Sequence, residues 1–261
     1  MSEEKDTKSR RWRCPQFRAA IIVVMALCCQ VSTAFAQIGE YRNVVAVGGS
    51  AGWNLANVAF IPKVPQNMMG GPTIGFTARY TTEKYFSSIC AIVGEVNISR
   101  IGWKEKILDI DDRPVTLASD TSQALFYQRK LTYVQIPVIA RMGWGRERRG
   151  LQFFFQAGPQ VGFLIGERSE TNFDLNTPLH NRRVSNVVAQ DTMSVEHKFD
   201  FGIMAGAGLE LSLPKVGHFL VEGRYYYGLG NLFGASKRDY FARSNQGVIT
   251  VKLAYLFDIV K

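Results

Sequence analysis

Hydrophobic and polar residues alternate one by one along much of this chain, most clearly between Leu131 and Gly166. A repeat of two residues predicts extended strands that carry one apolar face and one polar face. This stretch divides into the runs 131–145 and 151–166, joined by a short polar segment at 146–150. Two alternating runs joined by a short loop predict an antiparallel hairpin.

The bulky side chains of the hairpin fall on one face of each run. In the second run, large apolar residues alternate with glutamine and glycine. The large residues are Phe153, Phe155, Val161 and Phe163, and those on the opposite face are Gln152, Gln156, Gly158 and Gln160. An eight-stranded barrel has room inside only for its own side chains, so rows of phenylalanine are expected to point outward, into lipid.

Eight alternating segments are expected in all. They are Val44–Asn54, Pro72–Thr81, Tyr85–Arg100, the two runs of the hairpin, Lys198–Leu213, His218–Leu229 and Gly247–Ile259. Short connections are expected at 82–84, 145–150 and 213–217, and long ones at 55–71, 101–125, 167–197 and 230–246. Alternating loop lengths predict an all-β fold, an eight-stranded antiparallel up-and-down transmembrane β-barrel of the bacterial outer membrane. The even strand count places both termini on the periplasmic side.

The first 36 residues differ in composition from the rest. A basic start is followed by the apolar run Ala19–Val31 and then by Ala34-Phe35-Ala36, a pattern of small residues typical of a cleavage site. We therefore expect a signal peptide at 1–36 and a barrel domain at 37–261. Among the four cysteines only Cys90 lies in that domain, so no internal disulfide is expected.

The strands expected to form the wall carry charged residues on their inward, polar face. Four are basic and four are acidic, namely Arg79, Arg141, Arg224, Lys252, Glu95, Asp200, Glu210 and Glu222. Equal numbers predict a network of ion pairs that fills and closes the lumen. The alternative is a gated path for protons or ions. If the turn at 213–217 is centred on Lys215, Glu222 faces Gly208 and Arg224 faces Gly206, so that large residues oppose small ones.

The central hairpin contains a proline in each strand, Pro137 and Pro159. Proline cannot donate a ladder hydrogen bond, and a closed barrel has no edge strand to accommodate it. With the turn centred near its middle, Pro137 is expected opposite position 158, which is Gly158. We therefore predict a β-bulge or locally widened pairing there, forming the weakest seam of the wall. A partner protein could pack against that seam, or the prolines could simply bend the strands.

Candidate chemistry is sparse. The loop 167–197 contains His180 near Asp174, Ser185 and Asp191, but no fixed spacing supports a hydrolase, and solvated polarity is the simpler interpretation. The sequence shows no metal-ligand spacing and no nucleotide-binding loop, so no catalytic residue and no cofactor is expected. Five basic loop residues could pair with the phosphates of a surface glycolipid, or could serve only solubility. They are Arg182, Arg183, Lys237, Arg238 and Arg243.

Parts of the central hairpin and of the last two expected strands resemble a known family. Tyr133-Val134-Gln135-Ile136-Pro137 followed by Ala157-Gly158-Pro159 resembles the hallmark of PorT-like outer-membrane β-barrel proteins. The same holds for Glu222–Leu229 and a last strand that ends Ala254-Tyr255-Leu256-Phe257, although Asp258–Lys261 follow here. The resemblance covers nearly all of 37–261 and implies a part in type IX protein secretion.

These observations favour a non-enzymatic anchor or accessory component of a secretion or envelope complex. Its expected partners are outer-membrane lipid and glycolipid together with outer-membrane or periplasmic proteins. The alternative is a surface module that binds glycolipid, host protein or matrix protein through its long loops. Without residues 1–36, which hold six basic and three acidic residues, the net charge of +9 falls to about +6 and would still suit nucleic acid. No accessible sheet carries a basic stripe with stacking aromatics, however, so no nucleic acid is expected.

Overall fold

The computed structural model describes residues 40–117, 122–146, 149–174, 184–185, 187–234 and 240–260 of the 261-residue chain. The chain divides into two compact units, Met1–Gly39 and Glu40–Lys261, and only the second contains described residues. The signal peptide predicted at 1–36 lies outside them and stays a prediction.

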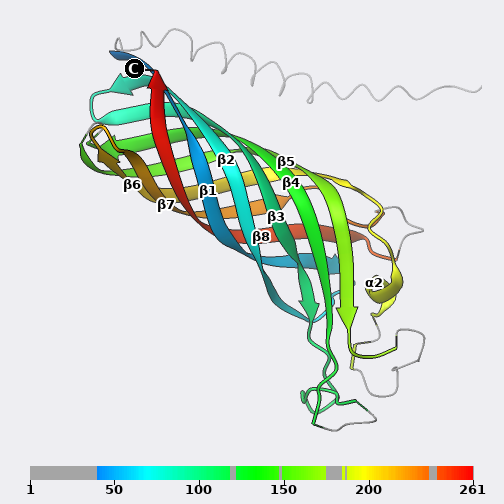
Figure 1. Ribbon diagram of the computed structural model, residues 1–261. Helices are drawn as coiled ribbons and strands as arrows, with labels where there is room; N and C mark the ends of the chain where they lie inside the picture. The colour runs from blue at the N-terminus through cyan, green and yellow to red at the C-terminus, as the bar shows by residue number, and fades with distance from the viewer. Residues whose placement is uncertain are drawn as a thin grey trace, which may run out of the picture. The chain divides into compact units, whose positions relative to one another are not determined.

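Eight antiparallel strands form a closed barrel in sequence order, which confirms the predicted fold class (Figure 1). Each strand pairs with its neighbours along the chain, and β1 closes the ring by pairing with β8 from Val45–Val260 to Ile61–Arg243. The strands are β1 (Glu40–Ile61), β2 (Gln66–Tyr85), β3 (Ser88–Glu105), β4 (Tyr127–Gly145), β5 (Gly150–Thr171), β6 (Phe199–Leu213), β7 (Gly217–Gly228) and β8 (Arg243–Val260).

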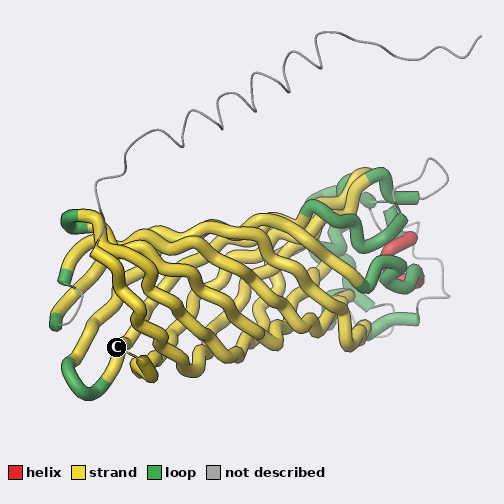
Figure 2. Tube along the Cα trace, turned by 90° about the horizontal axis from the view of Figure 1, so that it is seen from above, coloured by secondary structure: helices red, strands yellow, loops and turns green. Residues whose placement is uncertain are grey.

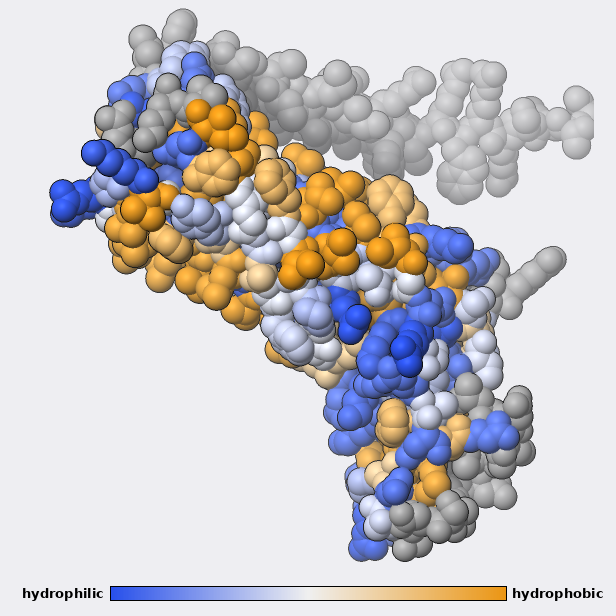
Figure 3. Space-filling view, in the orientation of Figure 1, coloured by the Kyte–Doolittle hydropathy of each residue, from blue (hydrophilic) through white to orange (hydrophobic). Residues whose placement is uncertain are grey.

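The outward face of the strands carries an apolar belt, visible as the orange band over the barrel wall (Figure 3). Its members are large apolar side chains that alternate with buried residues and stay exposed. They include Ile74, Phe76, Ile92, Val96, Ile98, Val138, Phe153, Phe155, Phe163, Phe201, Ile203, Val221, Val251 and Leu253. Such a belt is stable only against lipid, as the alternation predicted.

The four loop-side connections gather at one end of the barrel and the three turns at the other (Figure 2). The turns are β2–β3 at 86–87, β4–β5 at 146–149 and β6–β7 at 214–216. At the other end, the β1–β2 connection is short, at 62–65, and the three long loops are 106–126, 172–198 and 229–242. The loop 172–198 contains the short helix α2 (Ala189–Thr192). Among the described residues, no helix is both long and apolar enough to cross a membrane.

Two expected connections were wrong. The stretch 55–71 is mostly strand, because β1 runs on to Ile61 and β2 begins at Gln66. The same alternate positions face inward along the whole of β1, but near the loops these positions carry the apolar residues Ala56, Val58 and Phe60. The first turn lies at 86–87 instead of 82–84, because the polar residues expected to form it extend the paired strand.

Besides the rows of phenylalanine that face lipid as expected, other aromatic residues fill the interior. Trp103, Tyr127, Phe154, Phe233 and Phe241 are fully buried. Small residues on neighbouring strands make this possible. For example, a Cβ atom added to Gly208 would lie 2.5 Å from Cζ of Phe154. The phenylalanine ring therefore occupies space that exists only because position 208 has no side chain.

The structure has no β-bulge at the prolines, but the ladder pairing is interrupted beside them, at 138–139 of β4 and 158–159 of β5. The pairing of β4 with β5 runs to Pro137–Gln160 and resumes at Ala140–Ala157 in the same register. Pro137 thus lies opposite Gln160 rather than Gly158, because the β4–β5 turn is centred later than expected. The register shift in this pair falls between Thr132 and Tyr133, nearer the loops. There β5 has one more residue than β4, as in a β-bulge.

Candidate functional site: the filled lumen

The inward charges of the barrel form two clusters, and the first is centred on Glu95 of β3. Arg224 of β7 donates two hydrogen bonds to this carboxylate, at 2.7 and 2.6 Å. Lys252 of β8 adds a third at 2.7 Å. The bidentate pairing fixes the guanidinium plane as well as its charge. β3 is therefore joined across the lumen to β7 and β8, which are far from it in sequence.

Glu222 completes this first cluster from the same strand as Arg224. Its carboxylate lies 2.6 Å from the Arg224 guanidinium and accepts a hydrogen bond of 2.8 Å from Nε2 of Gln156. The register that puts these residues here is the predicted one, since Glu222 pairs with Gly208 and Arg224 with Gly206. The glycines on β6 leave the space that the long charged side chains fill.

The second cluster is centred on Glu210 of β6, nearer the turn end. Its carboxylate pairs with Arg79 at 2.7 Å, with Arg141 and with Nδ1 of His218 at 2.7 Å. The Arg141 guanidinium also lies 3.5 Å from the centre of the Phe154 ring, which is a close cation–π contact. Four strands, β2, β4, β6 and β7, meet at one carboxylate.

Asp200 lies apart from both clusters. It accepts a hydrogen bond of 2.7 Å from the Tyr226 hydroxyl and forms no ion pair among the described residues. The structure thus brings together seven of the eight predicted lumen charges. His218 is the member that the sequence analysis missed. Its only signal was its position beside a turn, on the strand that also carries Glu222 and Arg224.

His218 also links a serine and an aspartate in the order of a hydrolase triad. Nδ1 lies 2.9 Å from Oγ of Ser212, and Nε2 lies 3.0 Å from Oδ1 of Asp258. A seryl nucleophile must reach its substrate, but Ser212 is only 1% exposed, and Glu210 shares the same ring nitrogen. The geometry therefore suits a set of hydrogen bonds that joins β6, β7 and β8 better than it suits acyl transfer.

An apolar core closes the loop end of the lumen. Trp103 packs edge-on against Phe60 at 5.3 Å and Phe233 at 6.4 Å, and Phe233 stacks on Phe241 at 5.5 Å. Phe233 and Phe241 come from the loop 229–242, so this loop folds back into the barrel mouth. A smaller apolar group, with Phe154, Leu220 and Leu256 at its centre, packs beside the Glu210 cluster, since Leu220 pairs with Glu210 and Phe154 contacts Arg141.

The described end of the loop 172–198 is tied to this apolar core by polar contacts. Arg129 of β4 lies 5.7 Å from the Trp103 ring and donates a hydrogen bond of 2.9 Å to the carbonyl oxygen of Gln190. Gln190 in turn donates to Oε1 of Glu105 at 2.6 Å. These bonds hold helix α2 over the mouth of the barrel.

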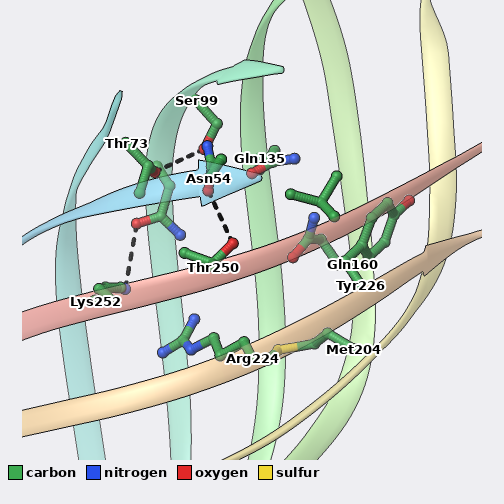
Figure 4. Close-up of a pocket in the computed structure, with 12 residues that line it drawn as sticks. Asn54, Thr73, Ser99, Gln135, Gln160, Met204, Arg224, Tyr226, Thr250 and Lys252 are labelled. Carbon is green, nitrogen blue, oxygen red and sulfur yellow. Dashed lines mark hydrogen bonds between the residues drawn. The ribbon is translucent and has the colours of Figure 1, made fainter. Parts of the chain in front are cut away.

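Between the apolar core and the first ionic cluster only a small cavity remains (Figure 4). Its volume is about 20 Å³, which has room for about one water molecule. Polar side chains line it, and two hydrogen bonds cross it, Thr73 to Ser99 at 2.7 Å and Thr250 to Asn54 at 2.8 Å. The lumen at this level is therefore filled almost completely by side chains.

The turn end, in contrast, opens into a cavity of about 650 Å³. Glu210 and His218 lie at its inner limit, and Arg42, Arg149 and Lys215 lie around its rim. Two large apolar residues are exposed at the same end, Phe86 at 79% and Tyr41 at 75%. This end of the barrel offers a concave, partly basic surface.

Four of the five predicted anion-binding residues lie outside the described residues, namely Arg182, Arg183, Lys237 and Arg238. His180 also lies outside them. Arg243 begins β8, donates to Oδ1 of Asn245 at 2.9 Å and lies beside the Tyr227 ring. The described part of the chain contains no group of His, Cys, Asp and Glu side chains able to hold a metal ion.

A closed, side-chain-filled barrel with an outward apolar belt defines a bacterial outer-membrane protein. The model of the family described as "Outer membrane protein beta-barrel domain" matches residues 35–234, and the chain belongs to that family. No curated protein matches the sequence.

Several solved barrels are similar in fold. Ail of Yersinia pestis is 12% identical with a TM-score of 0.36, and the match covers 84% of this chain and 99% of Ail. OprG of Pseudomonas aeruginosa is 12% identical with a TM-score of 0.41, covering 84% and 98%. The outer-membrane enzyme PagL is 11% identical with a TM-score of 0.35, covering 83% and 99%.

Proposed function

We propose that this protein is a non-enzymatic anchor of the outer membrane that holds an envelope or protein-secretion complex, as its PorT-like segments imply. The observation that carries the proposal is the filled lumen. An apolar core, the Glu95 cluster and the Glu210 cluster occupy successive levels of the barrel, and the second apolar group packs beside the Glu210 cluster. A barrel whose lumen is filled by side chains acts through its surfaces.

The long loops are proposed to lie outside the cell and both ends of the barrel domain in the periplasm. The support is the difference between the ends, since short turns are typical of the periplasmic side of such barrels and longer loops of the outer side. The turn end then presents the 650 Å³ cavity, Phe86 and Tyr41 to periplasmic or membrane-embedded partners.

Site-directed photo-crosslinking in cells, with an affinity tag after Lys261, tests the anchor proposal. A crosslinker at Phe86 or Lys215 should capture a defined envelope protein, and deletion of the gene should reduce secretion of exported proteins. The matched control is a crosslinker at Ile110, which is 90% exposed at the loop end. Capture at Ile110 alone, with secretion unchanged, would contradict the anchor function.

That last outcome would favour the alternative, a surface module for host, matrix or glycolipid ligands. One observation supports it, the tip of the loop 106–126. Oδ1 of Asp109 accepts hydrogen bonds of 2.9 Å from the backbone N–H groups of both Asp111 and Arg113, and the neighbouring Ile110 is exposed. A preorganised tip with an exposed apolar residue binds a partner with a smaller loss of conformational entropy.

A further inference from the structure

The outward residues of β3–β5 change from apolar to charged where the apolar belt ends. Outward residues switch from Ile98 to Arg100 on β3, and from Ile165 to Arg168 on β5. On β4 the outward residue Lys130 pairs with Arg168 across the sheet. Figure 3 shows hydrophilic side chains gathered over these strands, between the apolar band and the loops.

Positive charge is concentrated on the outward face of β3–β5 at this level. Four basic residues project from these strands, Arg100, Lys104, Lys130 and Arg168, together with Glu170, and the partly exposed Glu167 lies beside them. The outward residues at the loop end of β1 are in contrast uncharged, namely Leu55, Asn57, Ala59 and Ile61. This local concentration of basic side chains suits an anionic ligand.

The basic side chains surround a depression of about 240 Å³, lined by Arg100, Lys130 and Arg168 together with the acids Glu167 and Glu170. Glu167 is already paired with Arg129. Thr132 and Gly166 also line the depression, and Gly166 keeps it open because a glycine adds no side chain. Arg100 has no ion-pair partner in the described part of the chain, and the Arg168 side chain is 79% exposed. Two guanidinium groups are thus available to an incoming ligand.

Glu170 holds Lys130 in place from the edge of the depression. The ammonium group lies 2.6 Å from Oε2 of Glu170, and Nε of Arg168 lies 3.6 Å from Oε1. Hydrogen bonds from Lys130 and then from Gln128 hold the pKa of this exposed carboxyl below its ordinary value. A stronger anion would compete with this carboxylate for the same cations.

We propose that Arg100, Lys130 and Arg168 bind a phosphate group of the phosphorylated glycolipid in the outer leaflet. Arginine pairs with phosphate through two parallel hydrogen bonds, and lysine adds a point charge. Lipid phosphates lie directly beyond the hydrocarbon layer, which is where these cations begin on the wall. The inference uses the topology proposed above, in which the loop end faces out of the cell.

Native mass spectrometry of the full barrel in detergent, with added diphosphoryl lipid A, tests the proposal. Gln substitution of Arg100, Lys130 and Arg168 together should lower lipid occupancy at least about tenfold, because each loses a charge-assisted bond. Glu170→Gln should instead raise occupancy, because it removes the competing carboxylate. A gain of binding cannot arise from misfolding.

The matched control replaces three exposed basic residues elsewhere at the loop end, Lys63, Arg113 and Lys198, by glutamine. This variant should bind like the wild type. Dephosphorylated lipid A and phosphatidylglycerol should bind weakly, and excess inorganic phosphate should displace little diphosphoryl lipid A. Equal loss in the control variant, equal binding of any of these lipids, or full displacement by phosphate would each overturn the proposal.

Discussion

Arg224 lies between two carboxylates inside the barrel, with its guanidinium 2.6 Å from both Glu95 and Glu222. A buried ion pair contributes little over an apolar equivalent, but removing one partner leaves the other charge uncompensated. Arg224→Met should therefore lower the free energy of unfolding by about 3–5 kcal/mol, measured by urea titration in detergent micelles. The double variant E95Q/R224M should lose less than the sum of its single variants. Additive losses would show that the pairing has no energetic role.

The glycines of β6 allow the lumen to be filled because they have no side chain. A Cβ atom at Gly208 would meet Phe154 at 2.5 Å and the backbone oxygen of Val221 at the same distance. Gly208→Ala should therefore destabilise the barrel by about 1–3 kcal/mol, as overpacking does. Gly223→Ala on the neighbouring strand is the matched control, because nothing lies within 4 Å of its added Cβ atom. Equal effects of the two substitutions in the same titration would contradict this account of the packing.

At the scale of the elements, the alternation of apolar and polar residues predicted the number of strands and which side of each strand faces lipid. The β6–β7 register followed from a turn centred on Lys215, and the structure has that register. The ends of β1 and β2 could not be predicted in the same way. There Ala56, Val58 and Phe60 point inward, and an apolar residue that faces a buried core looks the same in sequence as one that faces lipid.

The lengths of the connections lead to a prediction about topology. A protease added to intact cells should cut within 106–126 or 172–198 and leave the turn at 146–149 intact, because only the long loops are proposed to face outward. After the outer membrane is permeabilised, the same protease should reach all of these segments. Cleavage of intact cells at 146–149 alone would reverse the orientation. The fragments can be assigned by mass.

At the scale of the whole molecule, the sequence predicted a filled lumen but not what fills its loop end. Period-two patterning assigns each strand residue to a face, and the inward charges therefore stood out. The apolar core at the mouth depends on Phe233 and Phe241, which a loop returns to the barrel. Loop residues have no period, so no pattern along the chain could place them beside Trp103. His218 was missed for a related reason, since its partners Glu210 and Asp258 come from two other strands.

The central claim, that the barrel is closed and acts through its surfaces, is tested most directly by conductance. Eight strands leave a lumen that side chains can fill, and here the remaining internal cavity is only about 20 Å³. The purified protein in planar lipid bilayers should therefore give no steady ion current above that of the bilayer alone. Large, stable and reproducible channels formed by the wild-type protein would contradict the account.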